Sequence, residues 1–163
     1  QAELGISKDK ANDLFQTYHS RVPFVKELMD AVSRRAQDSG KIRTLLGRLC
    51  RFHLWEPNHF GIHRSLPHEE ALREYGPGIK RAYTYKALNK LIQGSAADMT
   101  KKAMLDLYKE NIIPHIQIHD ELDISIKGDE FKKIIEIMEN AVRLETPNRV
   151  DYEFGENWGN IYD

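Results

Sequence analysis

The stretch from Ile112 to Ile126 reads IIPHIQIHDELDISI, and its pattern decides how the rest of the chain is interpreted. Apolar and polar residues alternate on both sides of a central His119-Asp120-Glu121. Alternation over β-branched residues predicts two strands, each with one apolar face, joined as a hairpin. Two adjacent carboxylates at the tip of such a hairpin offer the oxygen ligands that Mg²⁺ prefers. The other interpretation is a solvated turn, because Asp is common in turns.

Zinc bound by His115 and His119 is a further hypothesis for the same stretch. On a strand these two residues share a face but lie about 13 Å apart, at about 3.3 Å per residue. Because zinc–nitrogen bonds are about 2 Å long, one ion does not easily reach both rings. A zinc-dependent hydrolase is also disfavoured, since no Glu stands in an H-E-x-x-H arrangement. Mg²⁺ is therefore preferred over zinc.

The composition bounds the class of protein. The 163 residues are enough for one domain with a core, and the formal net charge of −1 means that any basic surface must be local. The single cysteine, Cys50, excludes an internal disulfide framework and is typical of a reducing compartment. No apolar run approaches the roughly 20 residues that a membrane-spanning helix needs. We therefore expect a cytoplasmic protein, in the host cytoplasm if a phage encodes it, without a membrane partner.

Apolar residues recur at helical spacing in four segments, which are Ser7 to His19, Pro23 to Gly40, Thr84 to Lys109, and Gly128 to Leu144. Ser7 is the expected N-cap of the first helix, and Pro23 has the favoured first position of the second. Gly40 is expected to end that second helix as its C′ residue. In each segment the apolar stripe predicts the side that packs inward.

Shorter elements are expected between and after these helices. Residues 41–54 are interrupted by Gly47 and contain three arginines, which predicts a basic hairpin. Residues 55–83 are rich in His, Pro and Gly, and we expect an irregular region with one short helix after Pro67. Apolar and polar residues alternate from Val150 to Phe154, which predicts one more strand.

The helix expected from Thr84 to Lys109 has a polar row separate from its apolar stripe. Tyr85, Asn89 and Gln93 follow one another at steps of four, so they share a face. A phenol and two amides can form hydrogen bonds with base edges and sugars without adding charge. Gly94 costs about 1 kcal/mol relative to Ala in a helix interior, so we expect another backbone or a ligand to approach closely there. The alternative is an ordinary polar face with a tolerated glycine.

Four motifs together resemble the C-terminal part of the polymerase domain of family A DNA polymerases, which include bacterial DNA polymerase I and bacteriophage replicases. Thr44 to Arg48 is similar to the family's T-x-x-G-R hairpin, and Asn89 to Asp98 is similar to its N-x-x-x-Q-G-[TS]-A-A-D helix. Ile118 to Leu122 resembles the palm motif called motif C, and Gly155 to Trp158 is similar to the usual C-terminal ending. The order and spacing of the motifs agree, so the resemblance covers nearly the whole chain.

The resemblance implies an α+β fold. A small antiparallel palm-type sheet would carry the motif C hairpin and would be backed by the two long helices. Residues 1–54 would form the fingers-side helices and the basic hairpin, residues 55–83 a loop region, and residues 84–163 the palm portion. The implied activity is DNA-directed DNA polymerisation in replication, with primer–template DNA and dNTP as partners.

Roles for single residues also follow from the resemblance. Asp120 would be a catalytic metal ligand, Glu121 its acidic neighbour that tunes the site or binds metal less directly, and His119 a contact to the primer end. Asn89 and Gln93 would contact the primer–template duplex near the minor groove, where acceptors are similarly placed in all Watson–Crick pairs.

Two further DNA contacts are expected from the same resemblance. Tyr85 stands where bacterial members often have Arg, so its DNA contact departs from the family pattern. Arg48 is a candidate contact to the template or primer backbone.

Catalysis by two Mg²⁺ ions requires carboxylates that bridge both. The family takes the bridging Asp from an earlier palm strand, motif A, and binds nucleotide with a fingers helix, and neither is found in these 163 residues. Either the polymerase is naturally divided among several chains or a longer one has been cut, and the length of 163 residues favours a separate chain. We therefore expect a hetero-oligomer in which other polymerase chains complete the site. The rival hypothesis is a non-catalytic DNA-binding or processivity module that keeps the fold.

Overall fold

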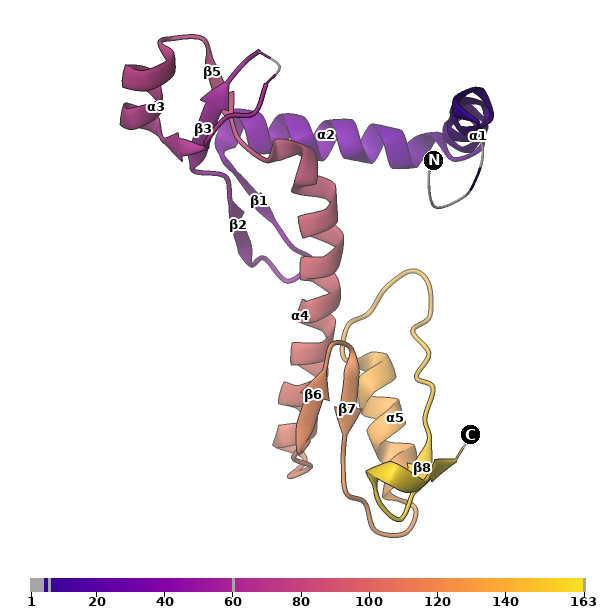
Figure 1. Ribbon diagram of the computed structural model, residues 1–163. Coiled ribbons are helices and arrows are strands. Elements are labelled where there is room, and N and C mark those ends of the chain that lie inside the picture. Colours follow the sequence, from indigo (N-terminus) through magenta and orange to yellow (C-terminus); the bar gives the residue numbers. More distant parts are fainter. Residues whose placement is uncertain (1–4, 6, 60, 163) are drawn as a thin grey trace. The chain divides into compact units, whose positions relative to one another are not determined.

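A computed structural model describes Gly5, residues 7–59 and residues 61–162, and divides the chain into two compact units (Figure 1). The first unit is Gln1–Gly94 and the second is Ser95–Asp163. Helix α4 (Ala87–Lys109) contributes residues 87–94 to the first unit and residues 95–109 to the second. The division into residues 1–54, 55–83 and 84–163 stays a prediction.

The first unit begins with α1 (Lys8–Arg21) and α2 (Pro23–Ser39). Both helices begin where predicted and α2 ends where predicted, whereas α1 continues two residues beyond the predicted end at His19. The Ser7 hydroxyl accepts a hydrogen bond from the Lys10 amide at 3.3 Å, which confirms the N-cap. Pro23 occupies the first turn of α2. Gly40 has a φ of 68° and its amide donates to the Ala36 carbonyl, so it ends α2 in the left-handed conformation.

The apolar stripe of α1 does not pack inward among the described residues, contrary to the expectation from its periodicity. Leu14, Phe15 and Tyr18 are 54%, 65% and 50% exposed. Val32 and Ala36 are the buried residues of α2, both in its second half, which packs against the hairpin that follows. Periodicity identifies an amphipathic helix but not the element that covers it, so the exposed side remains available to a partner.

The predicted basic hairpin is confirmed. Strands β1 (Lys41–Arg43) and β2 (Leu49–Arg51) pair antiparallel, with Ile42 opposite Cys50. The core of the unit joins α2, this hairpin and the start of α4, and consists of Val32, Ala36, Ile42, Phe52 and Ala87, with Cys50 and Leu91 packed against it. Cys50 is therefore a small, partly buried group beside the core.

Residues 55–83 contain more regular structure than the sequence predicts. Strands β3 (Leu54–Pro57), β4 (Leu66–Pro67) and β5 (Ile79–Arg81) form an antiparallel sheet in the order β4-β3-β5, beside α3 (His68–Tyr75) (Figure 1). The Arg81 guanidinium lies 4.5 Å from the centre of the Trp55 ring. It also donates hydrogen bonds to the carbonyls of Gln37 and Phe52, each at 3.0 Å. Arg81 thus ties this sheet to α2 and to the chain after β2.

The second unit contains residues 95–109 of α4, strands β6 (Ile116–Ile118) and β7 (Glu121–Asp123), and helix α5 (Glu130–Asn140). The β6–β7 hairpin and α5 lie alongside this part of α4 (Figure 1). Leu107 of α4 is fully buried, Ile134 of α5 is buried, and Lys133 of α5 forms a 2.7 Å ion pair with Glu110. This arrangement agrees with the expected α+β fold.

The end of the chain differs from the prediction of a strand from Val150 to Phe154. Strand β8 (Phe154–Gly155) pairs with β9 (Ile161–Tyr162), after a short helical turn, η2 (Trp158–Asn160). The Val150 amide instead donates to the Glu139 carboxylate of α5, at 3.2 Å. The alternation at this point reflects side chains packing on α5, since the Tyr152 and Phe154 rings both contact Phe131.

No helix of the described residues has the length and apolarity to cross a membrane.

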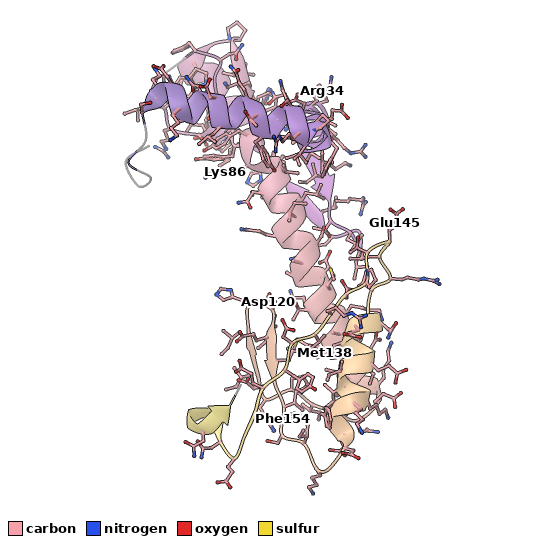
Figure 2. The ribbon with its side chains drawn as sticks, turned by 90° about the vertical axis from the view of Figure 1, so that its right-hand side faces the viewer. Arg34, Lys86, Asp120, Met138, Glu145 and Phe154 are labelled. Atoms are coloured by element: carbon pink, nitrogen blue, oxygen red, sulfur yellow. The ribbon has the colours of Figure 1, made fainter. Side chains whose placement is uncertain are left out.

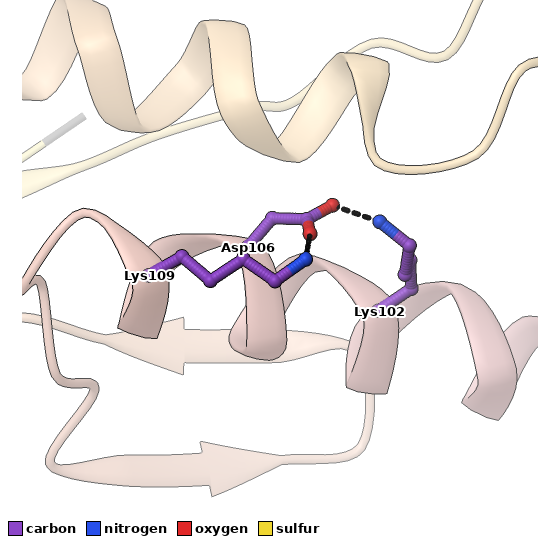
Figure 3. A network of polar contacts seen from close by, with 3 residues as sticks. All are labelled: Lys102, Asp106 and Lys109. Carbon is purple, nitrogen blue, oxygen red and sulfur yellow. Dashed lines mark hydrogen bonds and ion pairs between the residues drawn. The ribbon is translucent and has the colours of Figure 1, made fainter.

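A chain of ion pairs runs along α4 in the second unit (Figure 3). The Asp106 carboxylate accepts hydrogen bonds from the ammonium groups of Lys102 and Lys109, the second at 3.0 Å. The hydrogen bond from Lys102, followed by that from Lys109, lowers the pKa of the Asp106 carboxyl below its ordinary value of 3.8. A carboxyl group whose pKa is lower in the folded than in the unfolded state stabilises the fold at every pH at which the group is ionised.

Replacing Asp106 with Asn should lower the free energy of unfolding by about 0.5 kcal/mol at neutral pH, because water screens surface pairs of this kind. The stabilisation is fully present above the unfolded pKa near 3.8 and is lost as the pH falls through the lower folded pKa. Urea unfolding at several pH values should therefore show a difference that disappears in acid. Asp129→Asn is the control, since its pair with Lys132 spans 3.9 Å at an exposed site. A difference that does not shrink as the pH falls below 3.8 would contradict this account.

Candidate functional site

The His119-Asp120-Glu121 sequence lies at the tip of the β6–β7 hairpin, as predicted. Ile118 of β6 pairs with Glu121 of β7, so His119 and Asp120 form a two-residue loop. All three residues of the tip are exposed. Figure 2 shows Asp120 at the end of the hairpin. The tip therefore presents two neighbouring carboxylates to solvent on a short antiparallel ribbon.

His119 has a backbone conformation that side chains rarely adopt. Its φ is 53°, in the left-handed region, and its carbonyl accepts a 3.0 Å hydrogen bond from the Gln117 amide side chain. Non-glycine residues in this region cost about 1–2 kcal/mol relative to the right-handed conformation. The hairpin thus holds an imidazole next to Asp120 at the expense of backbone strain, which a glycine would relieve.

His119→Gly should therefore stabilise the chain by about 0.5–1 kcal/mol relative to His119→Ala, because alanine keeps the strain and glycine does not. Thermal unfolding of the two variants measures the difference, and both lack the imidazole. Matching Gly and Ala substitutions at Glu121, which lies within β7, are the control and should give the opposite order. Equal melting temperatures for the two His119 variants would show that the hairpin is not strained.

The register of the hairpin separates its apolar side chains. Directly paired residues share a face, so Ile118 lies on the face of Glu121, whereas Leu122 lies with Gln117 on the other face.

Within the described residues, β6 and β7 pair only with each other. The Asp123 Oδ2 atom is buried and has no hydrogen-bond partner among the described atoms. A two-stranded hairpin is marginally stable alone, so these open edges suit the addition of another strand.

The carboxylates at the tip fit part of a magnesium site. Asp120 and Glu121 supply oxygen ligands on an exposed turn, and Mg²⁺ is commonly held by one or two carboxylates together with substrate phosphates and water. Among the residues that the structure describes, no three His, Cys, Asp or Glu side chains are grouped to hold a metal ion. His115 lies just before β6, and His119 lies in the loop. Among the described residues, no third metal ligand is grouped with these two histidines. The described residues therefore show two carboxylates that could bind Mg²⁺ but no complete metal site.

The predicted polar row lies in the first unit. Tyr85 belongs to a helical turn, η1 (Thr84–Lys86), that precedes α4, while Asn89 and Gln93 lie on α4 itself. All three are exposed, Tyr85 to 70%. The ammonium of Lys86 lies 5.6 Å from the centre of the Tyr85 ring, which brings positive charge to this face. The row is therefore accessible to a ligand with hydrogen-bonding edges.

Gly94 marks a close contact with the β1–β2 hairpin, and the partner residue was not expected from the sequence. A Cβ atom at Gly94 would lie 2.7 Å from Cγ2 of Thr44, a distance that real Cβ atoms essentially never show. Thr44 is buried, and Nη2 of Arg48 donates a 2.7 Å hydrogen bond to the Gly94 carbonyl. The cost of glycine inside a helix was the available signal, but it did not identify Thr44.

Comparisons with known proteins agree with these features. Residues 1–160 match the family model described as DNA polymerase family A. A DNA-directed DNA polymerase of Pseudomonas phage M6 is 35% identical over 147 residues, which is 90% of this chain and 19% of the relative. DNA polymerase I of Geobacillus stearothermophilus is 32% identical over 165 residues, 95% of this chain and 17% of the relative.

A solved structure is similar over the same extent. The POL domain of Pol1 from M. smegmatis, in complex with DNA primer-template and dNTP, aligns with a TM-score of 0.69 at 28% identity. The alignment covers 96% of this chain and 26% of that chain. The 163 residues thus span less than a fifth of the two curated relatives' length, while nearly all of them are matched.

Proposed function

The chain belongs to DNA polymerase family A, and we propose that it supplies the motif C carboxylates and part of the DNA-binding surface for template-directed nucleotidyl transfer. The observation that carries this proposal is the exposed Asp120-Glu121 pair at the tip of the β6–β7 hairpin. The substrates would be dNTP and primer–template DNA, the ligands named for the similar M. smegmatis structure.

The tip would hold Mg²⁺ through Asp120, with Glu121 as a weaker or indirect ligand. The chemistry that divalent ions supply in such sites is activation of the attacking hydroxyl and stabilisation of the leaving phosphate. His119 would contact the primer end next to these carboxylates. The Gln117 amide holds the His119 carbonyl, which fixes the strained backbone from which the ring extends. The turn thus carries a residue with a hydrogen-bonding ring directly before the two acids.

Asn89 and Gln93 would contact the duplex from the exposed face of α4. Their amides can each donate to base acceptors or accept from sugars, and a helix holds them four residues apart on one side. Tyr85 would extend this row, with its ring next to Lys86 in place of the Arg that bacterial members often have. The arrangement suits contacts that depend on the shape of a correct pair and not on its sequence.

Another segment must complete the metal site. The described residues offer no group of three metal ligands, and among them β6 and β7 pair only with each other. We propose that a separate polymerase chain supplies the second Asp and the nucleotide-binding fingers helix. The exposed stripe of α1 around Phe15 would be part of the contact with that chain.

Primer extension tests the proposal. The 163-residue chain alone should not extend a primer, whereas extension should appear when it is mixed with the rest of G. stearothermophilus DNA polymerase I, expressed without the segment that this chain matches. A covalent hybrid of the two parts controls for weak assembly and should be active. Robust activity of the chain alone would overturn the shared site. A folded hybrid that binds DNA but does not extend it would favour a non-catalytic module.

A further inference from the structure

A hollow of about 620 Å³ lies beside strands β3 and β5 in the first unit. Its polar and aromatic lining residues are Glu56, Asn58, His59, His63, Lys80 and Tyr85. Its volume is within the range of about 300–1,000 Å³ that small-molecule sites have. We propose that this hollow binds one unpaired nucleotide, with the phosphate at Lys80 and the base against the exposed rings. The inference rests on the proposed function, because Tyr85 belongs both to the hollow and to the row that would contact the duplex.

A cross-strand pair supplies the positive charge of the hollow. Glu56 of β3 lies opposite Lys80 of β5, and their charged groups are 3.9 Å apart. The Lys80 side chain is 44% exposed and the Glu56 side chain 26%, so the ammonium is the more accessible of the two groups. An ammonium has three donors, and a contact this long leaves donors for a second acceptor. Lys80 can therefore bind a phosphate oxygen while Glu56 remains beside it.

Tyr85 gives the hollow a surface on which a base can stack. Its side chain is exposed, and the Lys86 ammonium lies 5.6 Å from the centre of its ring. Stacking of a base on an aromatic ring contributes about 1–3 kcal/mol and depends little on which base is present. A lysine next to the ring adds attraction for the phosphates on either side of that base. Aromatic and positive groups together are typical of sites for single-stranded nucleic acid.

Two histidines form a further part of the lining. The His59 and His63 rings meet edge to face with their centres 4.7 Å apart. Nε2 of His63 is buried and has no hydrogen-bond partner among the described atoms, and a Cβ atom at Gly61 would lie only 2.6 Å from it. The loop after β3 thus closes over the His63 ring because residue 61 is glycine. His59 is exposed, so its contact with His63 fixes a second ring that a ligand can reach.

The position of the hollow favours an unpaired nucleotide as its ligand. Tyr85 precedes Asn89 and Gln93 in the exposed row, so the hollow lies at the end of the proposed duplex contact. A strand that continues past that end without its complement would enter the hollow. A metal ion is disfavoured as the ligand, because no three metal-binding side chains are grouped among the described residues.

Binding of single-stranded DNA by the full chain tests the proposal. A fluorescent oligo(dT) should bind, and His59→Ala and Lys80→Ala should each weaken that binding about tenfold through lost contacts with the base or phosphate. Binding of a blunt duplex should be unchanged in both variants, because neither residue belongs to the row on α4. Fluorescence anisotropy measures both affinities, and thermal unfolding shows that each variant is folded.

Free dTMP, added as a competitor, distinguishes the source of the nucleotide. Absence of displacement supports a site for a nucleotide within a strand, since neighbouring phosphates then contribute to binding. Displacement of oligo(dT) by dTMP that both alanine variants weaken would support the same hollow with free nucleotide as its ligand.

Two control variants match these changes in their contacts but lie outside the hollow. His68→Ala removes an exposed histidine whose ring lies 4.7 Å from that of Trp55. Lys132→Ala removes a lysine whose ion pair with Asp129 also spans 3.9 Å. Both variants should bind oligo(dT) like the wild type. Equal losses in these controls would show that the general charge of the chain governs binding, and would overturn the proposal.

Photo-crosslinking distinguishes direct contact from an indirect effect on the fold. An oligonucleotide with 5-iodouracil in place of thymine should crosslink to peptides that cover residues 56–63 or 80–85. Gly61→Ala displaces the His63 ring without removing a polar group, so it should reduce those crosslinks. Crosslinks confined to other peptides, or oligo(dT) binding that is unchanged in both alanine variants, would overturn the proposal.

The same measurements separate this inference from the proposed function. Loss of duplex binding and of primer extension, with oligo(dT) binding that both alanine variants weaken, would contradict the polymerase function but not the hollow. Primer extension by the hybrid, together with crosslinks only to other peptides, would contradict the hollow but not the polymerase function.

Discussion

Asp120→Asn should reduce primer extension by the hybrid polymerase about 10³-fold, because the proposed function makes Asp120 a metal ligand in the transition state, where metal ions contribute several kcal/mol. Asparagine keeps the size of the side chain and one oxygen but not the negative charge. The exposed position of Asp120 in the loop means that the fold should tolerate the change. Single-turnover extension of a labelled primer measures the loss, with DNA binding measured in parallel.

Asp151→Asn is the matched control, since it removes the same charge from an exposed carboxylate of the same unit. It should leave extension within about twofold of the wild type. Glu121→Gln should have an intermediate effect if Glu121 binds metal less directly than Asp120. Full activity of Asp120→Asn in a hybrid that binds DNA normally would rule out a catalytic function for the hairpin tip.

Gly94→Ala should destabilise the chain by about 1–3 kcal/mol, the usual cost of inserting a methyl group into a packed site. Helix propensity alone predicts the opposite sign, because alanine is favoured over glycine by about 1 kcal/mol within a helix. The close contact with Thr44 decides between the two effects, since the new Cβ would lie 2.7 Å from Cγ2 of a buried side chain. Urea unfolding measures both the sign and the size.

A double-mutant cycle tests that explanation. Thr44→Ser removes Cγ2 but keeps the hydroxyl that donates to the Arg48 carbonyl at 3.3 Å. In the Thr44→Ser background the Gly94→Ala substitution should therefore cost little or become stabilising. An additive cycle would show that Thr44 is not the cause. Stabilisation by Gly94→Ala in the wild-type background would show that the glycine is merely tolerated.

Local signals in the sequence predicted the ends of elements well. Ser7, Pro23 and Gly40 each act through the backbone within a few residues, and the structure confirms all three. The basic hairpin and the acidic hairpin were also predicted, because alternation and turn residues are short-range features. Local chemistry therefore accounts for much of the secondary structure.

Long-range pairing was less accessible from the sequence. Strands β3, β4 and β5 have two to four residues each, too few for alternation to show, and their partners lie far apart in the chain. Arg81 gave no local indication that it would join this sheet to the Gln37 and Phe52 carbonyls. Likewise, the stripe of α1 predicted an amphipathic helix but not that it would be exposed.

The candidate site was predictable in composition but not in geometry. Alternation placed His119, Asp120 and Glu121 at a hairpin tip, and the hairpin is confirmed, while the functions that the resemblance implies for them remain predictions. The left-handed backbone of His119 has no sequence signature, because it results from pairing Ile118 with Glu121 across two residues. The glycine at position 94 indicated a close approach, but its neighbour came from a segment 50 residues earlier, Thr44.

The fit of Thr44 against Gly94 also constrains how this part of the molecule can change over generations. A mutation that gives position 94 a side chain would be selected against while threonine remains at position 44, yet it would be acceptable after threonine has become serine. Position 44 must therefore change before position 94 can gain a side chain. Descendants of this chain with alanine at position 94 should accordingly carry a smaller residue at position 44.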